Sequence, residues 1–297
     1  MNYAISFFIL GLNCFSDANP DVFKKTVYVG GCVLGKGLRP VERDVRLNLK
    51  RLTSLWADYR VCFYADDEAA NLLSAWNESR LEIILQSRFH VNSHRANSPY
   101  RTERLAIGRN ACLDLFRGML QSNATFDDGV LFISMDMDDV NRSPFKTEVI
   151  KAAVAEASQW DVLTFNRVAY YDYWALRNEK YDKNIMVHGG RSGWWEFTVH
   201  KEFGETVLDK SSLLWFHVYS AFDGLAIYKL NFTRQCHYDG EHQWKDGKNH
   251  TVYVEECEHV NFQKCMTEKN GARVLIYNRA YLNSTEHFFQ QDYQELH

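Results

Sequence analysis

The distribution of apolar and polar positions predicts alternating strands and helices in the first half of the chain. Short apolar runs at residues 25–34, 60–64 and 81–85 are typical of strands. The segments between them, 42–57 and 68–76, place apolar side chains at helical spacing. This β-α-β alternation predicts an α/β fold with a parallel sheet and right-handed crossovers.

The same pattern continues through the middle of the chain. Residues 101–121 are the strongest helix candidate, because their apolar side chains form one stripe. A strand at 130–135, a helix at about 145–157 and a strand at 161–165 are expected to follow. The second half of the chain is richer in Trp, Tyr and His and less regular, which suits a binding half joined to the regular half.

The most informative segment is the apolar run Val130–Met135, which is followed at once by Asp136, Asp138 and Asp139. Successive strand side chains point to opposite faces, so Asp136 and Asp138 share one side as the chain leaves the sheet. Ligands of open α/β sheets bind outside the carboxyl ends of the strands. Clustered carboxylates at this place favour a hard divalent cation with oxygen ligands. The structural alternative is an acidic loop that caps the next helix, because Asp is a common N-cap residue.

Composition excludes several classes of function. The chain has 297 residues, which is enough for one large α/β domain or two small ones. With 46% hydrophobic and 24% charged residues, it can bury a sizeable core. The net charge of −4 gives no electrostatic reason for binding nucleic acid or an anionic membrane. We therefore expect no nucleic-acid partner. We also expect no membrane-spanning segment, because the N-terminal apolar stretch is too short to span a bilayer comfortably.

The N-terminal segment and the sequons predict a secretory location. Residues 1–18 combine a short apolar stretch with small residues before a plausible cleavage site, which is typical of a signal peptide, although Lys and Arg are missing before the stretch. A first core strand or a truncated anchor is the alternative. The chain has six Asn-x-Ser/Thr sequons against roughly two expected by chance. They begin at Asn77, Asn123, Asn141, Asn231, Asn249 and Asn283. We expect the ER or Golgi lumen, or secretion, and no glycan at Asn141, which adjoins the acidic motif.

The cysteines divide into two groups. Three of them lie close together late in the chain and are candidates for a disulfide, namely Cys236, Cys257 and Cys265. Three others lie in apolar runs and are expected to be buried thiols, namely Cys32, Cys62 and Cys112. The sequence contains no Cys-x-x-Cys pair, so the cysteine spacing does not suggest a zinc site.

Four segments resemble, in their order along the chain, those of one enzyme family. Arg101–Asn110 resembles the Arg-x-x-x-Ala-x-x-Arg-Asn helix that precedes the Asp-x-Asp strand in some GT-A glycosyltransferases. Tyr170–Arg177 resembles the Tyr-Asp-x-Trp-x-x-Arg segment of fungal capsule-associated α-1,3-mannosyltransferases, and Ser220–Tyr228 is similar to their Ser-Cys-Trp-Asn-Gly segment. Glu256–Phe262 stands where GT-A enzymes carry a late acidic motif. The resemblance covers roughly residues 26–280.

The resemblance implies one GT-A-like domain at residues 26–290 with a mostly parallel central sheet flanked by helices. In it, residues 26–140 would bind the nucleotide sugar and residues 141–290 would bind the acceptor. The implied activity is metal-dependent transfer of a sugar to a glycan or glycoprotein hydroxyl. GDP-mannose is the favoured donor, a UDP-sugar is next, and the implied cofactor is Mn²⁺ or Mg²⁺.

The site residues follow from the acidic motif and from this resemblance. The expected metal ligands are Asp136, Asp138 and His259. The residues expected to hold the donor are Arg104, Arg109 and Asp136. The candidates for catalysis are Glu258 and Asp139, and those for acceptor binding are Tyr171, Asp172, Trp174 and Gly224. Glycosyl transfer needs these types, because carboxylates hold the metal and arginines offset phosphate charge.

Residue types leave two questions open. An inverting enzyme needs a general base, for which Glu258, Glu256 and Asp223 are candidates, whereas a retaining enzyme can pass the proton to the leaving phosphate. A metal-dependent phosphodiesterase or nucleotidyltransferase also uses Asp pairs at strand ends. A secreted carbohydrate-binding protein without catalysis would account for the aromatic residues and the sequons, but not for the acidic motif.

Overall fold

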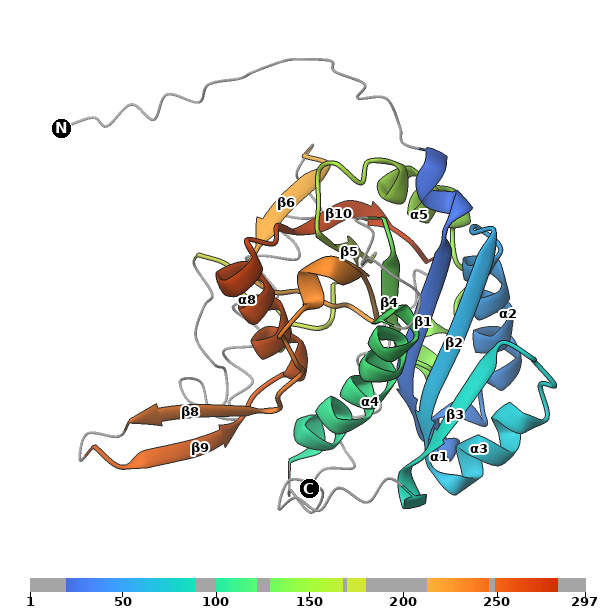
Figure 1. The fold of residues 1–297 in the computed structure, drawn as a ribbon, viewed down its shortest axis with the longest axis horizontal. Helices are drawn as coiled ribbons and strands as arrows, with labels where there is room; N and C mark the ends of the chain where they lie inside the picture. The colour runs from blue at the N-terminus through green and yellow to red at the C-terminus, as the bar shows by residue number, and fades with distance from the viewer. Residues whose placement is uncertain are drawn as a thin grey trace.

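The fold is built on one eight-stranded sheet with the order β3-β2-β1-β4-β7-β5-β10-β6 (Figure 1). The computed structural model describes residues 20–88, 100–121, 129–167, 170–179, 213–245 and 249–282. In sheet order, the strands are β3 (Leu81–Leu85), β2 (Asp58–Ala65), β1 (Thr26–Val33), β4 (Leu131–Met135), β7 (Leu225–Lys229), β5 (Val162–Asn166), β10 (Val274–Ala280) and β6 (Trp215–Val218). The predicted signal peptide at residues 1–18 lies outside the described residues.

The sheet is parallel from β3 to β4 and mixed beyond it. The pairs β3–β2, β2–β1 and β1–β4 are parallel, as is the pair of β5 and β10. β7 runs antiparallel between β4 and β5, and β6 is antiparallel to β10. The same sheet therefore carries both the predicted nucleotide-binding half and the predicted acceptor-binding half.

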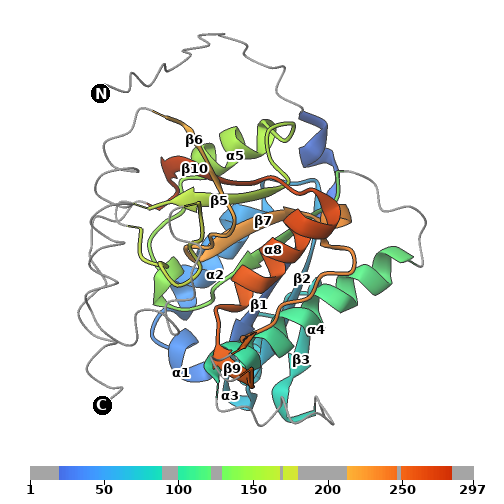
Figure 2. The same cartoon turned by 90° about the vertical axis from the view of Figure 1, so that its left-hand side faces the viewer.

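Helices cover both faces of the sheet, as Figure 2 shows from the side. The helices are α1 (Gly35–Leu38), α2 (Glu42–Thr53), α3 (Asp67–Ser74), α4 (Arg101–Gln121), α5 (Thr147–Ala155) and α8 (Glu258–Asn270). The buried side chains of α2, α3 and α5 pack into one core cluster, and those of α4 and α8 pack into another on the opposite face. The predicted α/β architecture, a mostly parallel central sheet flanked by helices, is confirmed.

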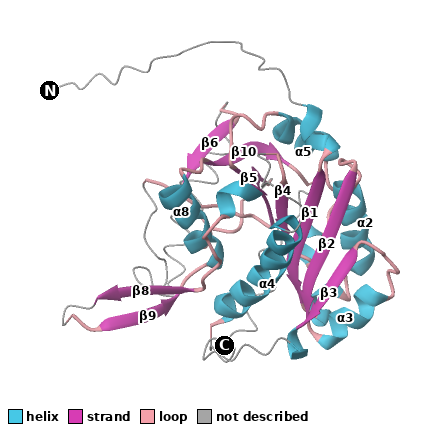
Figure 3. Cartoon of the chain, viewed as in Figure 1, coloured by secondary structure: helices cyan, strands magenta, loops and turns pink. Residues whose placement is uncertain are grey.

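Short elements complete the described chain. Four 3₁₀ helices are η1 (Pro20–Lys24), η2 (Gln86–Arg88), η4 (Asp139–Asn141) and η6 (Leu230–Thr233). A separate antiparallel hairpin is formed by β8 (Glu241–Lys245) and β9 (Thr251–Glu255), and it extends away from the central sheet (Figure 3). None of the helices in the described part of the chain combines the length and hydropathy needed to cross a bilayer.

A glycine allows α4 to lie directly on the parallel half of the sheet. A Cβ added at Gly108 would lie 2.5 Å from Cδ1 of Tyr64 and 2.6 Å from Sγ of Cys32. Real Cβ atoms do not approach other atoms so closely, so only glycine permits this packing. The next residue, Arg109, is thereby held above the sheet, where it donates to Ser134 of β4.

The cysteines are distributed largely as the sequence predicts. Cys236 forms a disulfide with Cys265, and this bond ties the segment after η6 to α8. The third candidate, Cys257, is a buried free thiol at the start of α8. The cysteines expected to be thiols are free, with Cys62 and Cys112 buried and Cys32 half-buried.

Candidate functional site

The predicted acidic motif lies where the strand order of the sheet reverses. β2 follows β1 on one side, whereas β4 lies on the other side of β1. Such a reversal opens a crevice at the carboxyl ends of the strands, and this is where ligands of α/β sheets bind. Gly37, in the short helix α1 after β1, lies beside the motif, since a Cβ there would be 3.6 Å from Cβ of Asp138. The segments that follow β1 and β4 therefore meet at the acidic residues.

Arg109 holds two of the predicted site carboxylates. Its guanidinium donates to Oδ1 of Asp136 and to Oε1 of Glu258, both at 2.9 Å, and to Oγ of Ser134 at 2.7 Å. It also lies 4.9 Å from the ring centroid of Phe222. The Arg109 and Glu258 side chains are each only 4% exposed. Arg109 is therefore a positioning residue, which fixes the orientation of the Asp136 and Glu258 carboxylates.

Asp138 combines the capping role and an open carboxylate oxygen. Its Oδ1 accepts a hydrogen bond from the backbone N–H of Val140 at 3.1 Å and so caps η4. In the described part of the chain, Oδ2 of Asp138 and Oδ2 of Asp136 have no hydrogen-bond donor. Burial raises the pKa of Asp138 to about 7, and the charges of Asp136 and Asp139 add to the shift. Asp139 itself is exposed at the start of η4.

A buried asparagine fixes the acidic loop against the rest of the site. Asn141 Nδ2 donates to the carbonyl oxygens of Asp136 and Gly224, both at 2.8 Å. Its Oδ1 accepts from the hydroxyl of Tyr281 at 2.9 Å. The side chain of Asn141 is fully buried. The sequon at Asn141 is therefore inaccessible in the folded protein, as its place beside the motif predicts.

Gly224, predicted to contact the acceptor, supports the acidic loop directly. Its carbonyl accepts from the backbone N–H of Asp136 at 3.0 Å. Its φ of 86° lies in the left-handed region, and a Cβ there would come within 2.5 Å of Cγ1 of Val140. The glycine is thus required both by its backbone conformation and by close packing.

We expect Gly224→Ala to lower the free energy of unfolding by roughly 3 kcal/mol, because left-handed strain adds to overpacking against Val140. Gly271→Ala is the matched control. Gly271 has a φ of 67° and no atom within 4 Å of an added Cβ. Gly271→Ala should therefore lower the free energy of unfolding by only about 1–2 kcal/mol, from backbone strain. Urea unfolding of both variants measures the difference, and equal losses would exclude a packing role for Gly224.

The segment predicted to bind the acceptor lies beside the same carboxylates. Oδ1 of Asp223 accepts from the backbone N–H groups of Tyr171 at 3.1 Å and Asp172 at 3.4 Å. Burial raises the pKa of Asp172 to about 7, and the charges of Asp136 and Glu258 add to the shift. Asp172 therefore shares one electrostatic environment with the acidic motif and with the start of α8.

Trp174 is placed in the same segment, and it is half-buried. Its indole N–H is buried and has no hydrogen-bond acceptor within the described ranges. Its carbonyl accepts from Nη1 of Arg177 at 2.9 Å. Nη2 of Arg177 forms an ion pair with Oε1 of Glu256 at 2.7 Å. The segment is thus anchored to the residues that precede α8.

His259 lies in the core beside the site. Its ring stacks on Phe222 with the centroids 3.7 Å apart, and Nδ1 shares a hydrogen bond with the hydroxyl of Tyr228 at 3.2 Å. Burial, with a contribution from Arg109, holds the pKa of His259 well below its usual value. No three His, Cys, Asp or Glu side chains in the described segments are grouped to hold a metal ion. The structure therefore does not bring His259 together with the acidic motif as a ligand set.

The two arginines predicted to hold the donor lie in different environments on α4. Arg104 is exposed, and its Nη1 donates to the carbonyl of Tyr100 at 3.3 Å. Arg109 is buried and holds carboxylates. The structure thus brings together Arg109, Asp136 and Glu258 through hydrogen bonds, and it leaves Arg104 at the surface.

Arg167 lies in the same electrostatic environment as the site, and the sequence pattern does not predict it. It directly follows β5, is only 8% exposed, and its guanidinium lies 5.1 Å from the ring centroid of Tyr171. The charges of Asp223 and Asp138 act on it, but no carboxylate of the described residues forms an ion pair with it. Its position in the sequence is the feature that could indicate a role, because Arg167 directly follows β5 as Asp136 directly follows β4.

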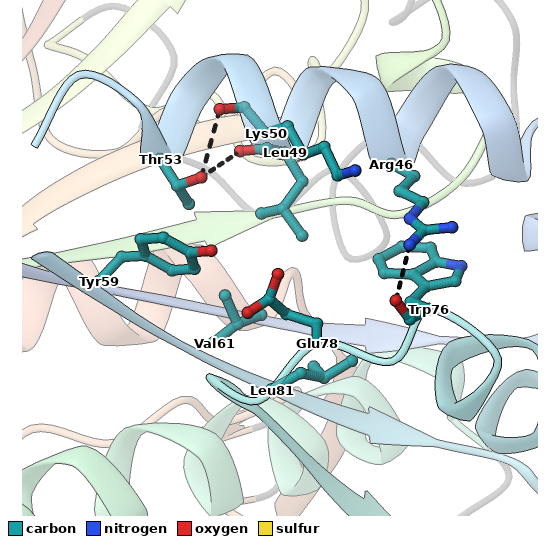
Figure 4. Close-up of a pocket in the computed structure, with 9 residues that line it drawn as sticks. All are labelled: Arg46, Leu49, Lys50, Thr53, Tyr59, Val61, Trp76, Glu78 and Leu81. Atoms are coloured by element: carbon teal, nitrogen blue, oxygen red, sulfur yellow. Dashed lines mark hydrogen bonds between the residues drawn. The ribbon is translucent and has the colours of Figure 1, made fainter.

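A small pocket lies elsewhere on the molecule, between α2 and the strands β2 and β3 (Figure 4). Its walls are formed by Arg46, Leu49, Lys50, Thr53, Tyr59, Val61, Trp76, Glu78 and Leu81. Arg46 and Thr53 in this wall donate to backbone carbonyls of the chain. The pocket contains none of the predicted site residues, so we do not assign it a part in the chemistry of the acidic motif.

No protein-family model and no curated protein matches this sequence. In structure, the chain is similar to residues 1–349 of TarS from S. aureus, with 13% identity and a TM-score of 0.40, over 86% of this chain and 59% of that one. The same TarS segment in complex with UDP gives 14% identity and a TM-score of 0.42 over 87% and 59%. A longer TarS structure has 12% sequence identity and a TM-score of 0.41, and the match covers 86% of this chain and 36% of that one. The chain thus spans less than two thirds of these structures, and at such TM-scores the likeness does not bear on activity.

Proposed function

We propose that this chain is a glycosyltransferase that moves a sugar from a nucleotide-sugar donor to a glycan or glycoprotein hydroxyl. The observation that carries the proposal is the position of Asp136 and Asp138 at the carboxyl end of β4, where the strand order reverses. Each residue keeps one carboxylate oxygen without a donor in the described part of the chain. The order of the four segments that resemble GT-A enzymes supports the same activity.

The two carboxylates fit a hard divalent cation, Mn²⁺ or Mg²⁺. Such ions are commonly held by one or two carboxylates together with phosphate oxygens of a substrate, so a third protein ligand is not required. A cation held by Asp136 and Asp138 would offset the negative charge that develops on the departing nucleoside diphosphate. Arg109 and Asn141 hold the acidic loop in place before substrate binds, which lowers the cost of reorganisation.

In the transfer itself, the acceptor oxygen bonds to the anomeric carbon while the bond from that carbon to the phosphate oxygen breaks. The bonding electrons leave with the diphosphate. The hydroxyl proton passes to a carboxylate in an inverting reaction, or to the leaving phosphate in a retaining one. Glu258 already accepts a hydrogen bond from Arg109. Asp172, with a pKa of about 7, is a second candidate for the base.

The finer assignments rest on the resemblance and on the disulfide. The similarity of Tyr170–Arg177 and Ser220–Tyr228 to fungal α-1,3-mannosyltransferases supports GDP-mannose as donor, with a UDP-sugar next. The bond between Cys236 and Cys265 supports an oxidising compartment, such as the ER or Golgi lumen or the cell exterior.

The first experiment is a panel of nucleotide sugars tested with and without Mn²⁺. We expect one nucleotide family, GDP-linked before UDP-linked, to raise the melting temperature only with metal and to be slowly hydrolysed. A donor concentration of 100 times its Kd adds about 2.7 kcal/mol to the free energy of unfolding, and a thermal shift detects this gain readily. No response to any donor would contradict the proposal. Glycan binding without turnover would favour a carbohydrate-binding protein, and phosphodiester cleavage without sugar transfer would favour a phosphodiesterase.

A further inference from the structure

Arg167 is a buried cation that the proposed reaction does not use. It directly follows β5, which is separated from β4 by β7, so it stands on the acceptor side of the acidic motif. Its residue is 8% exposed, and the ring of Tyr171 lies 5.1 Å below the guanidinium. Within the described residues, no carboxylate or carbonyl accepts a hydrogen bond from its guanidinium. Arginine stays charged in proteins and buried charges are normally paired, so this position is suited to an anion from outside the chain.

A second unpartnered group faces the same region. Asp223 is fully buried, and its Oδ1 accepts backbone hydrogen bonds from Tyr171 and Asp172. Its Oδ2 is buried and has no hydrogen-bond partner among the described residues. The charges of Asp223 and Arg167 act on each other, yet the two side chains form no ion pair.

The backbone holds Asp223 in an unfavourable conformation. Its φ is 56°, in the left-handed region that non-glycine residues rarely adopt. Its carbonyl lies 3.0 Å from the hydroxyl of Tyr281, whose single proton it shares with Oδ1 of Asn141. Strain of this kind persists where the surrounding structure enforces it, and it is common at functional sites. Among the described residues, a buried carboxylate oxygen of Asp223 and the guanidinium of Arg167 therefore lie near each other at the acceptor side, and neither has a hydrogen-bond partner there.

We propose that Arg167 and Asp223 recognise an acidic acceptor. Arg167 binds a carboxylate or phosphate group of the acceptor, and Oδ2 of Asp223 accepts a hydrogen bond from a neighbouring hydroxyl. The proposal rests on the proposed glycosyltransferase function and names the class of its acceptor. The diphosphate of the donor is the competing source of an anion, because the charge of Asp138 also acts on Arg167.

The test compares wild type with Arg167→Gln and Arg167→Lys on matched acceptors, namely an oligosaccharide with a uronic acid carboxylate and the same compound as its neutral amide. We expect wild type to prefer the acid by about 10-fold or more in kcat/KM, as one charge-assisted hydrogen bond allows. Arg167→Gln should bring the preference within about twofold of unity, and Arg167→Lys should restore part of it. Arg80→Gln is the matched control, because Arg80 also lies over a tyrosine ring, 4.7 Å from that of Tyr59, but is exposed.

Several outcomes would overturn the proposal. A wild type without preference for the acid would do so without any variant. An Arg167→Gln enzyme whose donor KM rises equally with both acceptors would place the donor diphosphate at Arg167. A lower melting temperature with unchanged preference would make Arg167 a structural cation. Calorimetry of acidic-acceptor binding without donor separates this proposal from the proposed transferase function. If the acid binds, the binding depends on Arg167 and the protein shows no sugar transfer, only the transferase function is refuted.

Discussion

Asp138→Asn is expected to lower kcat/KM for sugar transfer by roughly 100-fold or more while the protein stays folded. The substitution removes one of the two carboxylates proposed to hold the divalent cation. The amide oxygen of Asn still accepts from the N–H of Val140, so the cap of η4 is kept. Burial and the charges of Asp136 and Asp139 disfavour the ionised carboxylate. A neutral side chain should therefore leave the free energy of unfolding unchanged or slightly raised at pH 8.

The Asp44→Asn variant provides a matched control for this prediction. Asp44 also pairs with a loop residue after β4, since its carboxylate lies 3.4 Å from Nε of Arg142, but its side chain is 45% exposed. We expect Asp44→Asn to keep wild-type activity and the thermal shift with Mn²⁺. Asp138→Asn should lose both. Full activity in Asp138→Asn, or a metal response that survives in it, would remove the acidic motif from the proposed mechanism.

The elements around the motif could be predicted because their signals are local. The helix at Arg101–Gln121 and the strand at Leu81–Leu85 have the predicted bounds. The helix before Trp56 ends at Thr53, earlier than its apolar spacing predicts, although Trp56 still packs in the core. Asp136 and Asp138 were found for the same reason, because an apolar strand and its acidic end are adjacent in the sequence.

The rest of the site depends on contacts between distant segments. Spacing along the helix at 101–121 places Arg109 off the apolar stripe. From spacing alone, a residue on a solvated helix face is as good an interpretation as a site residue. The structure buries it because its carboxylate partners come from elsewhere, Asp136 from 27 residues away and Glu258 from 149 residues away. Likewise, the antiparallel insertion of β7 brings Asp223 to Tyr171, 52 residues apart in sequence. Periodicity contains no information about such pairings.

Arg167 shows the same limit in another way. A single Arg after a short strand has no partner in the sequence that would distinguish it from a surface residue. Its meaning comes from burial to 8% exposure and from the ring of Tyr171 beneath it. A charged residue that directly follows a buried strand is a site candidate whichever sign it carries, because the carboxyl ends of parallel strands lie at the same edge of the sheet.

Replacing Arg109 is expected to have the largest effect on stability. Arg109→Met leaves Glu258, whose side chain is 4% exposed, as an unpaired buried charge, and this costs about 3–5 kcal/mol. Asp136 is 23% exposed and should contribute less. Arg109→Lys keeps the charge but loses the planar fork that reaches two carboxylates and a hydroxyl, so we expect an intermediate loss. Urea unfolding at pH 7.5 measures these differences.

A second substitution separates the charge of Glu258 from its position. Adding Glu258→Gln to Arg109→Met removes the unpaired charge and should recover about half of the lost stability. It should not restore sugar transfer, because Asp136 is still not held and because Glu258, a candidate for the base, has been replaced. The ion pair of Arg177 and Glu256, at 2.7 Å with side chains 1% and 4% exposed, is the benchmark for stability alone, and Arg177→Met should cost a similar amount. If Arg109→Met unfolds at the urea concentration of wild type, the hydrogen bonds of Arg109 do not hold this site together.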